Sequence, residues 1–175
     1  MKIFLTGASR GIGKALKENL VNHDVIATTR DGGYDIENCY DYVLESILKS
    51  DADVFINNAY SPKYQTMLLK DVFDAWKYLD KKIINIGSCA SDMSQDNPMR
   101  NEEYPKNKIE QDDLVKQINL DYCSSGHLDG VLCKVTNVKM GYVKTDFPSL
   151  MDKRKFPNLK TEYVSSVIDW IINQP

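Results

Sequence analysis

The stretch Thr6-Gly7-Ala8-Ser9-Arg10-Gly11-Ile12-Gly13 decides the fold of this chain. It follows a short apolar run, Lys2–Leu5, which predicts a strand, and it opens a segment whose apolar residues recur at helical spacing. In such a loop Gly7 permits a tight turn, Gly11 lets a pyrophosphate approach the backbone, and Gly13 lets the helix pack closely on the sheet. The alternative is a glycine-rich turn with no ligand. The position between strand and helix favours a phosphate site, because a helix N-terminus offers N–H donors and partial positive charge.

Strand-like and helix-like segments alternate through the rest of the chain. The expected strands are Lys2–Leu5, Val25–Thr29, Val54–Ile56, Ile83–Ile86 and Val131–Val138. Continuous apolar strands separated by amphipathic helices predict a parallel sheet that is covered on both faces. We therefore expect an α/β fold, Rossmann-like and doubly wound, in one domain over residues 1–175. Its ligand should lie beyond the carboxyl ends of the strands.

Composition excludes several classes of function. The 175 residues and 20.0 kDa suit one domain, and 42 % apolar with 27 % charged residues exclude a disordered chain. The net charge of −3 gives no basic field for nucleic acid or anionic lipid, and no apolar run is long enough to span a bilayer. The four cysteines lack a C-x-x-C pattern, so we expect reduced thiols in a cytoplasmic protein and no metal site.

The end of the second expected strand bears on which dinucleotide is bound. A site for NAD would carry an acidic residue here, but the sequence has Thr29 followed by Arg30. A guanidinium suits a 2′-phosphate, and Arg10 of the glycine loop could add a second positive charge. The chain has only four arginines, so two at these places favour NADP(H) over NAD(H). Two solvated arginines are the alternative, and the adjacent Asp31 opposes phosphate binding.

Later segments complete an ordered pattern with the glycine loop. These are Asn57-Asn58-Ala59, Ser88 after Ile84-Asn85-Ile86-Gly87, the pair Tyr104 and Lys108, and Met140-Gly141-Tyr142-Val143-Lys144-Thr145. Together they resemble the short-chain dehydrogenase/reductase family in its single-domain form, with Tyr60 and Met140 standing where the family has glycine and proline. Asp35-Ile36 resembles the family's short third strand, which brings the expected sheet to about six strands.

The resemblance assigns roles to particular residues. It implies that Ser88, Tyr104 and Lys108 are catalytic. Tyr104 would exchange the proton, Lys108 would lower the pKa of Tyr104 and hold the nicotinamide ribose, and Ser88 would donate a hydrogen bond to the substrate oxygen. The implied cofactor contacts are Gly7, Ser9, Arg10, Gly11, Ile12, Gly13, Arg30, Asp35, Ile36, Asn58, Ala59, Tyr104, Lys108, Gly141, Val143 and Thr145.

A second pair with the same Y-x-x-x-K spacing, Tyr78 and Lys82, has to be weighed against the first. It joins a helix end to the next strand and precedes Ser88, so we interpret it as accidental. Tyr104 and Lys108 follow Ser88 at the head of a helix, where residues four apart share a face. The order in the chain therefore favours this pair.

The chain also departs from the family's pattern. Between Asn58 and Ser88 there is room for one substantial helix where the family usually has two, and Leu68 falls where the family has its fourth catalytic residue, an asparagine. The family's water-linked proton relay therefore has no asparagine at this position. The family's seventh strand is missing after the last helix, and we expect a substrate lid at Phe147–Leu159.

The sequence thus predicts an oxidoreductase that transfers a hydride between NADP(H) and the carbonyl or alcohol group of a small substrate. A nucleotide-sugar reductase or epimerase is one alternative, and a non-catalytic NADP(H)-binding sensor or interaction module is another. Members of the family commonly form dimers through two long helices, which correspond here to about residues 65–79 and 106–125. The resemblance therefore suggests a homodimer. The sequence does not identify the substrate.

Overall fold

Five parallel strands form the centre of the molecule. The computed structural model describes residues 1–124, 130–144 and 159–174. The strands run in the spatial order β2-β1-β3-β4-β5, and every neighbouring pair is parallel. The order reverses at β1, which confirms the prediction of a doubly wound α/β sheet. The strands are β1 (Lys2–Leu5), β2 (Asp24–Ala27), β3 (Val54–Asn57), β4 (Lys82–Ser88) and β5 (Lys134–Met140).

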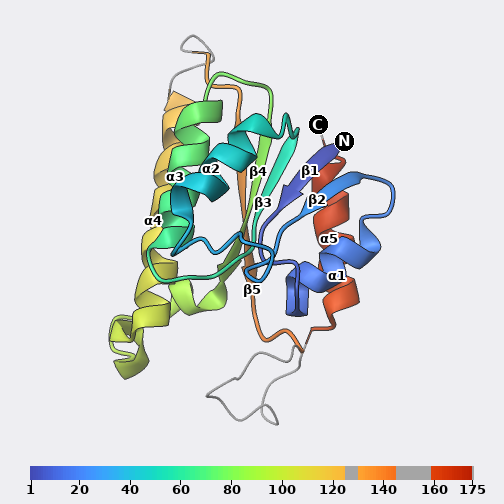
Figure 1. Cartoon of the computed structure of the whole chain (residues 1–175). Coiled ribbons are helices and arrows are strands. Elements are labelled where there is room, and N and C mark those ends of the chain that lie inside the picture. Colours follow the sequence, from blue (N-terminus) through green and yellow to red (C-terminus); the bar gives the residue numbers. More distant parts are fainter. Residues whose placement is uncertain (125–129, 145–158, 175) are drawn as a thin grey trace.

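Helices cover both faces of this sheet (Figure 1). One face carries α1 (Gly11–Asn19) and α5 (Thr161–Ile172), and the other carries α2 (Tyr40–Lys49), α3 (Tyr64–Trp76) and α4 (Glu103–Ser124). Successive strand side chains point to opposite faces, so β1 and β3 contribute to two separate cores. Phe4 and Phe55 pack toward α2, α3 and α4, whereas Ile3, Leu5 and Ile56 pack toward α1 and α5.

The strand expected at Asp35-Ile36 is not formed, so the sheet of the described residues has five strands and β2 lies at its edge. The Asp35 carboxylate accepts the N–H of Glu37 at 3.0 Å and the side-chain amide of Asn38 at 2.9 Å. The Asp35 carbonyl also accepts the N–H of Cys39 at 2.8 Å. These local hydrogen bonds bend the segment into turns and compete with strand pairing.

The last strand begins later than the sequence predicted. Residues 131–133 form a connection, in which the Leu132 N–H donates to the carbonyl of Lys77 at 2.8 Å, and β5 runs from Lys134 to Met140. Two short 3₁₀ turns, η1 (Cys89–Asp92) and η2 (Pro98–Asn101), join β4 to α4. Among the described helices, none combines the length and apolar character that crossing a membrane requires.

Candidate active site

The glycine loop links the end of β1 to the start of α1, and its geometry requires glycine. Gly7 and Gly11 have φ values of +73° and +55°, in the region that favours glycine. A Cβ atom on Gly13 would lie 2.1 Å from the carbonyl oxygen of Gly7 and 2.6 Å from the Asn58 Nδ2. The helix therefore approaches the loop more closely than any side chain permits.

The start of α1 suits an anionic group. Its N-cap residue is Arg10, whose guanidinium has no acceptor atom and therefore cannot cap the helix. The first turn of α1 also contains no acidic residue. The first N–H groups and the positive end of the helix dipole thus fit a phosphate, which is the chemistry that a dinucleotide presents.

Asn58, which follows the neighbouring strand β3, holds the loop in place through hydrogen bonds with Thr6 and Gly7. The Thr6 hydroxyl accepts the N–H groups of Asn58 and Ala59 at 3.2 and 3.1 Å. The Asn58 side-chain amide donates to the carbonyls of Thr6 and Gly7 at 3.0 and 3.1 Å. Asn58 therefore supports the loop from behind, while its predicted contact with a cofactor stays a prediction.

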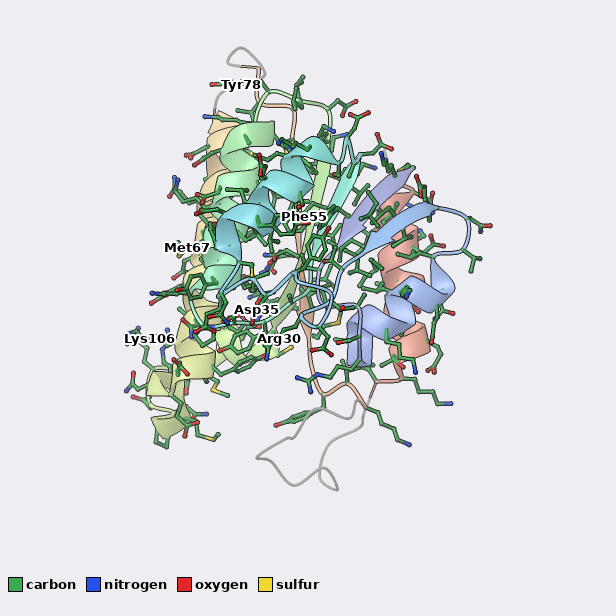
Figure 2. All side chains as sticks on the ribbon, in the orientation of Figure 1. Arg30, Asp35, Phe55, Met67, Tyr78 and Lys106 are labelled. Atoms are coloured by element: carbon green, nitrogen blue, oxygen red, sulfur yellow. The ribbon has the colours of Figure 1, made fainter. Side chains whose placement is uncertain are left out.

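Arg30 faces an acidic residue, which the sequence did not reveal. Its Nε lies 3.6 Å from the Asp35 carboxylate, and 66 % of its side chain is exposed (Figure 2). The N–H of Glu37 contributes most to lowering the pKa of Asp35, with Asn38 and Arg30 adding to it. The guanidinium is thus partly balanced by a carboxylate. Ile36, a predicted contact, is 3 % exposed and packs in the core.

Ser88 and Tyr104 come together at the carboxyl end of β4. Ser88 ends the strand, and its hydroxyl accepts the N–H of Ala90 at 3.1 Å. Tyr104 lies in the first turn of α4 and keeps 40 % of its surface exposed. Burial of the hydroxyl raises the pKa of Tyr104, and a hydrogen bond with the Ser88 side chain opposes that rise. The structure therefore brings these two residues together, and their predicted catalytic roles stay predictions.

Lys108 lies one turn after Tyr104 and is 5 % exposed. Its ammonium donates to Gln65 Oε1 at 2.8 Å, to the Ile86 carbonyl at 3.0 Å and to Gln111 Oε1 at 3.1 Å. An ammonium has three N–H donors, so this arrangement leaves none for a ribose hydroxyl. Desolvation lowers the pKa of Lys108 to about 7.

Two expectations about Lys108 stay predictions, and the geometry bears on each of them. The ribose contact is not prepared in this structure, because internal acceptors take all three donors. The pKa of Tyr104 is raised rather than lowered, because burial outweighs every favourable contact. The shared helix face that the spacing predicted is present, since the Lys108 Nζ lies 5.8 Å from the centre of the Tyr104 ring.

Tyr60 is a site residue whose role the sequence did not predict. Its ring centre lies 5.0 Å from that of Tyr104 and 5.4 Å from the Lys108 Nζ. Burial raises the pKa of Tyr60, and a hydrogen bond from the Asn107 side chain opposes the shift. The signal for it was the departure from the family's motif directly after Ala59. Tyr60 and Tyr104 together cover the Lys108 ammonium.

Gln65 is the second such residue. Leu68, the residue aligned with the family's asparagine, is fully buried in the apolar core. Gln65 lies one turn earlier on the same buried face of α3, is 3 % exposed, and contacts Lys108 directly. A lone polar side chain on an otherwise apolar helix stripe was the signal that could have identified it.

The competing pair Tyr78 and Lys82 lies elsewhere. Tyr78 is 62 % exposed and lies at the end of the molecule opposite Arg30 and Asp35 (Figure 2). The Lys82 Nζ donates to the carbonyl of Ile172 at 3.0 Å. The interpretation of this pair as accidental agrees with its position.

The segment after β5 is described only in part. Val143 forms an isolated parallel bridge with Leu159. Thr145 and residues 147–158 of the expected lid lie outside the described residues, so their predicted roles stay predictions. Within the described ranges, no cluster of three or more His, Cys, Asp or Glu side chains could hold a metal ion. All four cysteines are unpaired.

Comparison with known proteins places this geometry among solved folds. No family model and no curated protein matches the chain. A 3-alpha-hydroxysteroid dehydrogenase from Pseudomonas sp. B-0831, complexed with NADH, matches with a TM-score of 0.75 and 18 % identity over 99 % of this chain and 90 % of the other. An alcohol dehydrogenase from the archaeon Thermococcus sibiricus, complexed with 5-hydroxy-NADP, matches with a TM-score of 0.70 and 18 % identity, over 100 % and 92 % of the two chains.

A short-chain dehydrogenase from Sphingobium yanoikuyae, in complex with NADPH, gives a TM-score of 0.71 and 17 % identity over 98 % of this chain and 84 % of the other. At such identities the likeness concerns the fold. It extends over nearly the whole chain and includes the sheet that carries the glycine loop, Ser88 and the helix with Tyr104 and Lys108. The chain thus has the fold of the short-chain dehydrogenases/reductases.

Proposed function

We propose that this protein is an oxidoreductase that transfers a hydride between NADP(H) and the carbonyl or alcohol group of a small substrate. The observation that carries the proposal is the meeting of Ser88 and Tyr104 at the carboxyl end of β4, where the Ser88 side chain offsets part of the rise in the pKa of Tyr104. Ligands of doubly wound sheets bind at these strand ends, and the glycine loop of β1 opens toward the same end. Several solved proteins of this fold bind NADH, 5-hydroxy-NADP or NADPH.

The proposed chemistry divides between the cofactor and two hydroxyl groups. A bound nicotinamide supplies the hydride for carbonyl reduction and accepts it in alcohol oxidation. During reduction the substrate oxygen gains negative charge, and the Ser88 hydroxyl donates a hydrogen bond to it. Tyr104 transfers its phenolic proton to that oxygen, which completes the alcohol and leaves a phenolate on Tyr104.

Lys108 acts on this step by charge. Its Nζ lies under the Tyr104 ring, and a charged ammonium there favours the phenolate over the phenol. Because its N–H groups are bound to Gln65, Ile86 and Gln111, we assign it no contact with the substrate. The protonation state of Lys108 therefore controls how easily Tyr104 releases its proton.

The preference for NADP(H) is supported by the positions of Arg10 and Arg30. Thr29 stands where an NAD site would have an acidic residue. The 3.6 Å separation between Arg30 and Asp35 acts in the opposite direction, because a carboxylate repels a 2′-phosphate. Binding NADP(H) at this place requires Arg30 to exchange Asp35 for the phosphate, and 66 % exposure of its side chain leaves it free to turn.

One observation favours a second candidate, a module that binds NADP(H) without turnover. Burial raises the pKa of Tyr104, which holds the proton on its hydroxyl. This candidate uses the same glycine loop and differs from the first only in chemistry.

Turnover of a panel of small aldehydes and ketones with NADPH separates the two. The variant Tyr104→Phe keeps the ring and removes the transferable proton, so turnover should fall by roughly 10²–10⁴-fold with NADPH affinity nearly unchanged. Tyr78→Phe is the matched control, since Tyr78 is exposed and lies at the far end of the sheet. Equal turnover in the parent and Tyr104→Phe would remove Tyr104 from the mechanism, and NADPH binding without turnover in the parent would establish the second candidate.

A further inference from the structure

We propose that Gln65 is a positioning residue, whose amide oxygen fixes the Lys108 ammonium beneath Tyr104 and favours its charged form where no carboxylate does so. The inference rests on the proposed function of the pair Tyr104 and Lys108. It means that a residue in the first turn of α3 helps to set the protonation of Lys108, which lies on α4. Among the described residues, Lys108 forms no ion pair, and its partners are two glutamine amides and one carbonyl.

The orientation of the Gln65 amide is fixed by the backbone around it. Its Nε2 donates to the carbonyls of Asn57 at 3.0 Å and Ile86 at 3.4 Å. The Asn57 side chain returns a hydrogen bond to the Gln65 carbonyl at 3.0 Å. With its NH₂ group directed at two carbonyl oxygens, the amide must turn its Oε1 away from them. That oxygen is 2.8 Å from the Lys108 Nζ, the shortest of the three contacts of the ammonium.

Rigid elements support this arrangement. Asn57 ends β3, and its side chain donates to Asn85 Oδ1 of β4 at 3.0 Å, directly across the paired strands. Asn85 in turn donates to Asn137 of β5 at 2.8 Å. Gln65 is therefore anchored to a row of asparagines that crosses three strands of the sheet.

Gln111 differs from Gln65 in this respect. Its Oε1 accepts from Lys108 at 3.1 Å, but its buried Nε2 has no hydrogen-bond partner among the described residues. No further hydrogen bond thus holds the Gln111 amide in its orientation, and Gln111 lies on the same helix as Lys108. Gln65 comes from a different helix and fixes the position of Lys108 relative to β3 and β4.

The surroundings of Lys108 show why a neutral amide matters there. The titratable groups that face it are Tyr104 on α4 and Tyr60 after β3, whose ring centres lie at 5.8 and 5.4 Å. From β4 it meets the Ile86 carbonyl, and from α3 it meets Gln65. Burial favours the uncharged amine, whereas each acceptor favours the ammonium. Loss of the best-anchored acceptor should therefore shift Lys108 further toward the amine.

The test measures the protonation of Lys108 directly, without cofactor or substrate. The protein is labelled with ¹³Cε-lysine, the Lys108 resonance is assigned by its loss in Lys108→Met, and its chemical shift is followed against pH. In Gln65→Leu the pKa of Lys108 should fall by about one to two pH units, the equivalent of one hydrogen bond to a charged group. In Gln65→Glu the new carboxylate should raise it above that of the parent. Gln117→Leu, on the exposed side of α4, is the control and should leave it unchanged.

Two results would overturn the proposal. One is a folded Gln65→Leu protein in which Lys108 titrates as in the parent. The other is a Gln65→Glu protein whose Lys108 pKa is unchanged or lower, and this variant decides the matter alone where Gln65→Leu does not fold. Where the parent has turnover, the alkaline limb of the pH profile should move down in Gln65→Leu by the same shift. Absence of turnover in the parent refutes the proposed function. The role of Gln65 is then decided by the titration of Lys108 alone.

Discussion

Burial of Lys108 predicts a particular dependence of stability on pH. The residue is 5 % exposed, and desolvation lowers its pKa from 10.5 to about 7. In the unfolded chain the same ammonium is solvated and keeps its ordinary pKa. Between pH 7 and 10.5 the unfolded state therefore binds a proton that the folded state does not, and the free energy of unfolding rises with pH.

The magnitude follows from the size of the pKa change. One pH unit corresponds to about 1.4 kcal/mol, so the full change of about 3.5 units is worth about 5 kcal/mol. Below pH 7 both states hold the proton, and stability no longer depends on Lys108 titration. Over the accessible range from pH 7 to 9.5 the expected gain is about 3 kcal/mol.

Urea unfolding at intervals from pH 6 to 9.5 can measure this gain. The informative quantity is the difference in unfolding free energy between the parent and Lys108→Met, because the other titrating groups cancel in it. That difference should be constant below pH 7 and should move in favour of the parent above it. Lys106→Met changes an exposed lysine two residues earlier on α4, and its difference from the parent should not vary with pH (Figure 2).

A difference between the parent and a folded Lys108→Met that stays constant from pH 6 to 9.5 would refute the reasoning. It would mean that Lys108 remains charged in the folded protein throughout that range. The amide acceptors of Gln65 and Gln111 would then outweigh desolvation.

Three further predictions concern the loop, the cofactor and assembly. Gly13→Ala places a Cβ 2.1 Å from the Gly7 carbonyl oxygen, so thermal unfolding should show a loss of about 1–3 kcal/mol together with weaker NADPH binding, and an unchanged Tm would contradict the close packing. Arg30→Ala should weaken NADPH binding more than NADH binding in fluorescence titrations, and an equal loss would remove the 2′-phosphate contact. Sedimentation should show a homodimer joined through the exposed faces of α3 and α4, and particles of 20.0 kDa alone at high concentration would reject it.

The parts of the fold that the sequence predicted correctly depend on local patterns. Apolar runs marked the buried strands, and the glycine loop marked the first turn between strand and helix. The strand expected at Asp35-Ile36 could not be tested in this way. The segment has suitable residues, but local hydrogen bonds to Glu37 and Asn38 bend it into turns. Strand formation there depends on whether side-chain turns or a neighbouring strand satisfy the backbone, and apolar patterning does not report that competition.

The candidate site divides in the same way. Chain order separated Tyr104 and Lys108 from Tyr78 and Lys82, and the structure brings Tyr104 to Ser88. The environment of Lys108 was not predictable, because its three acceptors come from α3, β4 and α4. A spacing of four along a helix predicts that two residues share a face, but it gives no information on how deeply that face is buried from solvent.

The position of Gln65 depends on the single helix that joins β3 to β4. The chain has one helix between β3 and β4, and that helix begins soon after Asn57. The first turn of α3 therefore remains beside the end of β3, where the Gln65 amide reaches the Asn57 carbonyl and the Lys108 ammonium together. An asparagine has a side chain one methylene shorter and could not make both contacts from the same backbone position. Gln65→Asn should consequently keep the hydrogen bond to Asn57 or the one to Lys108 but not both, and in the same titration it should lower the pKa of Lys108 by no more than Gln65→Leu does.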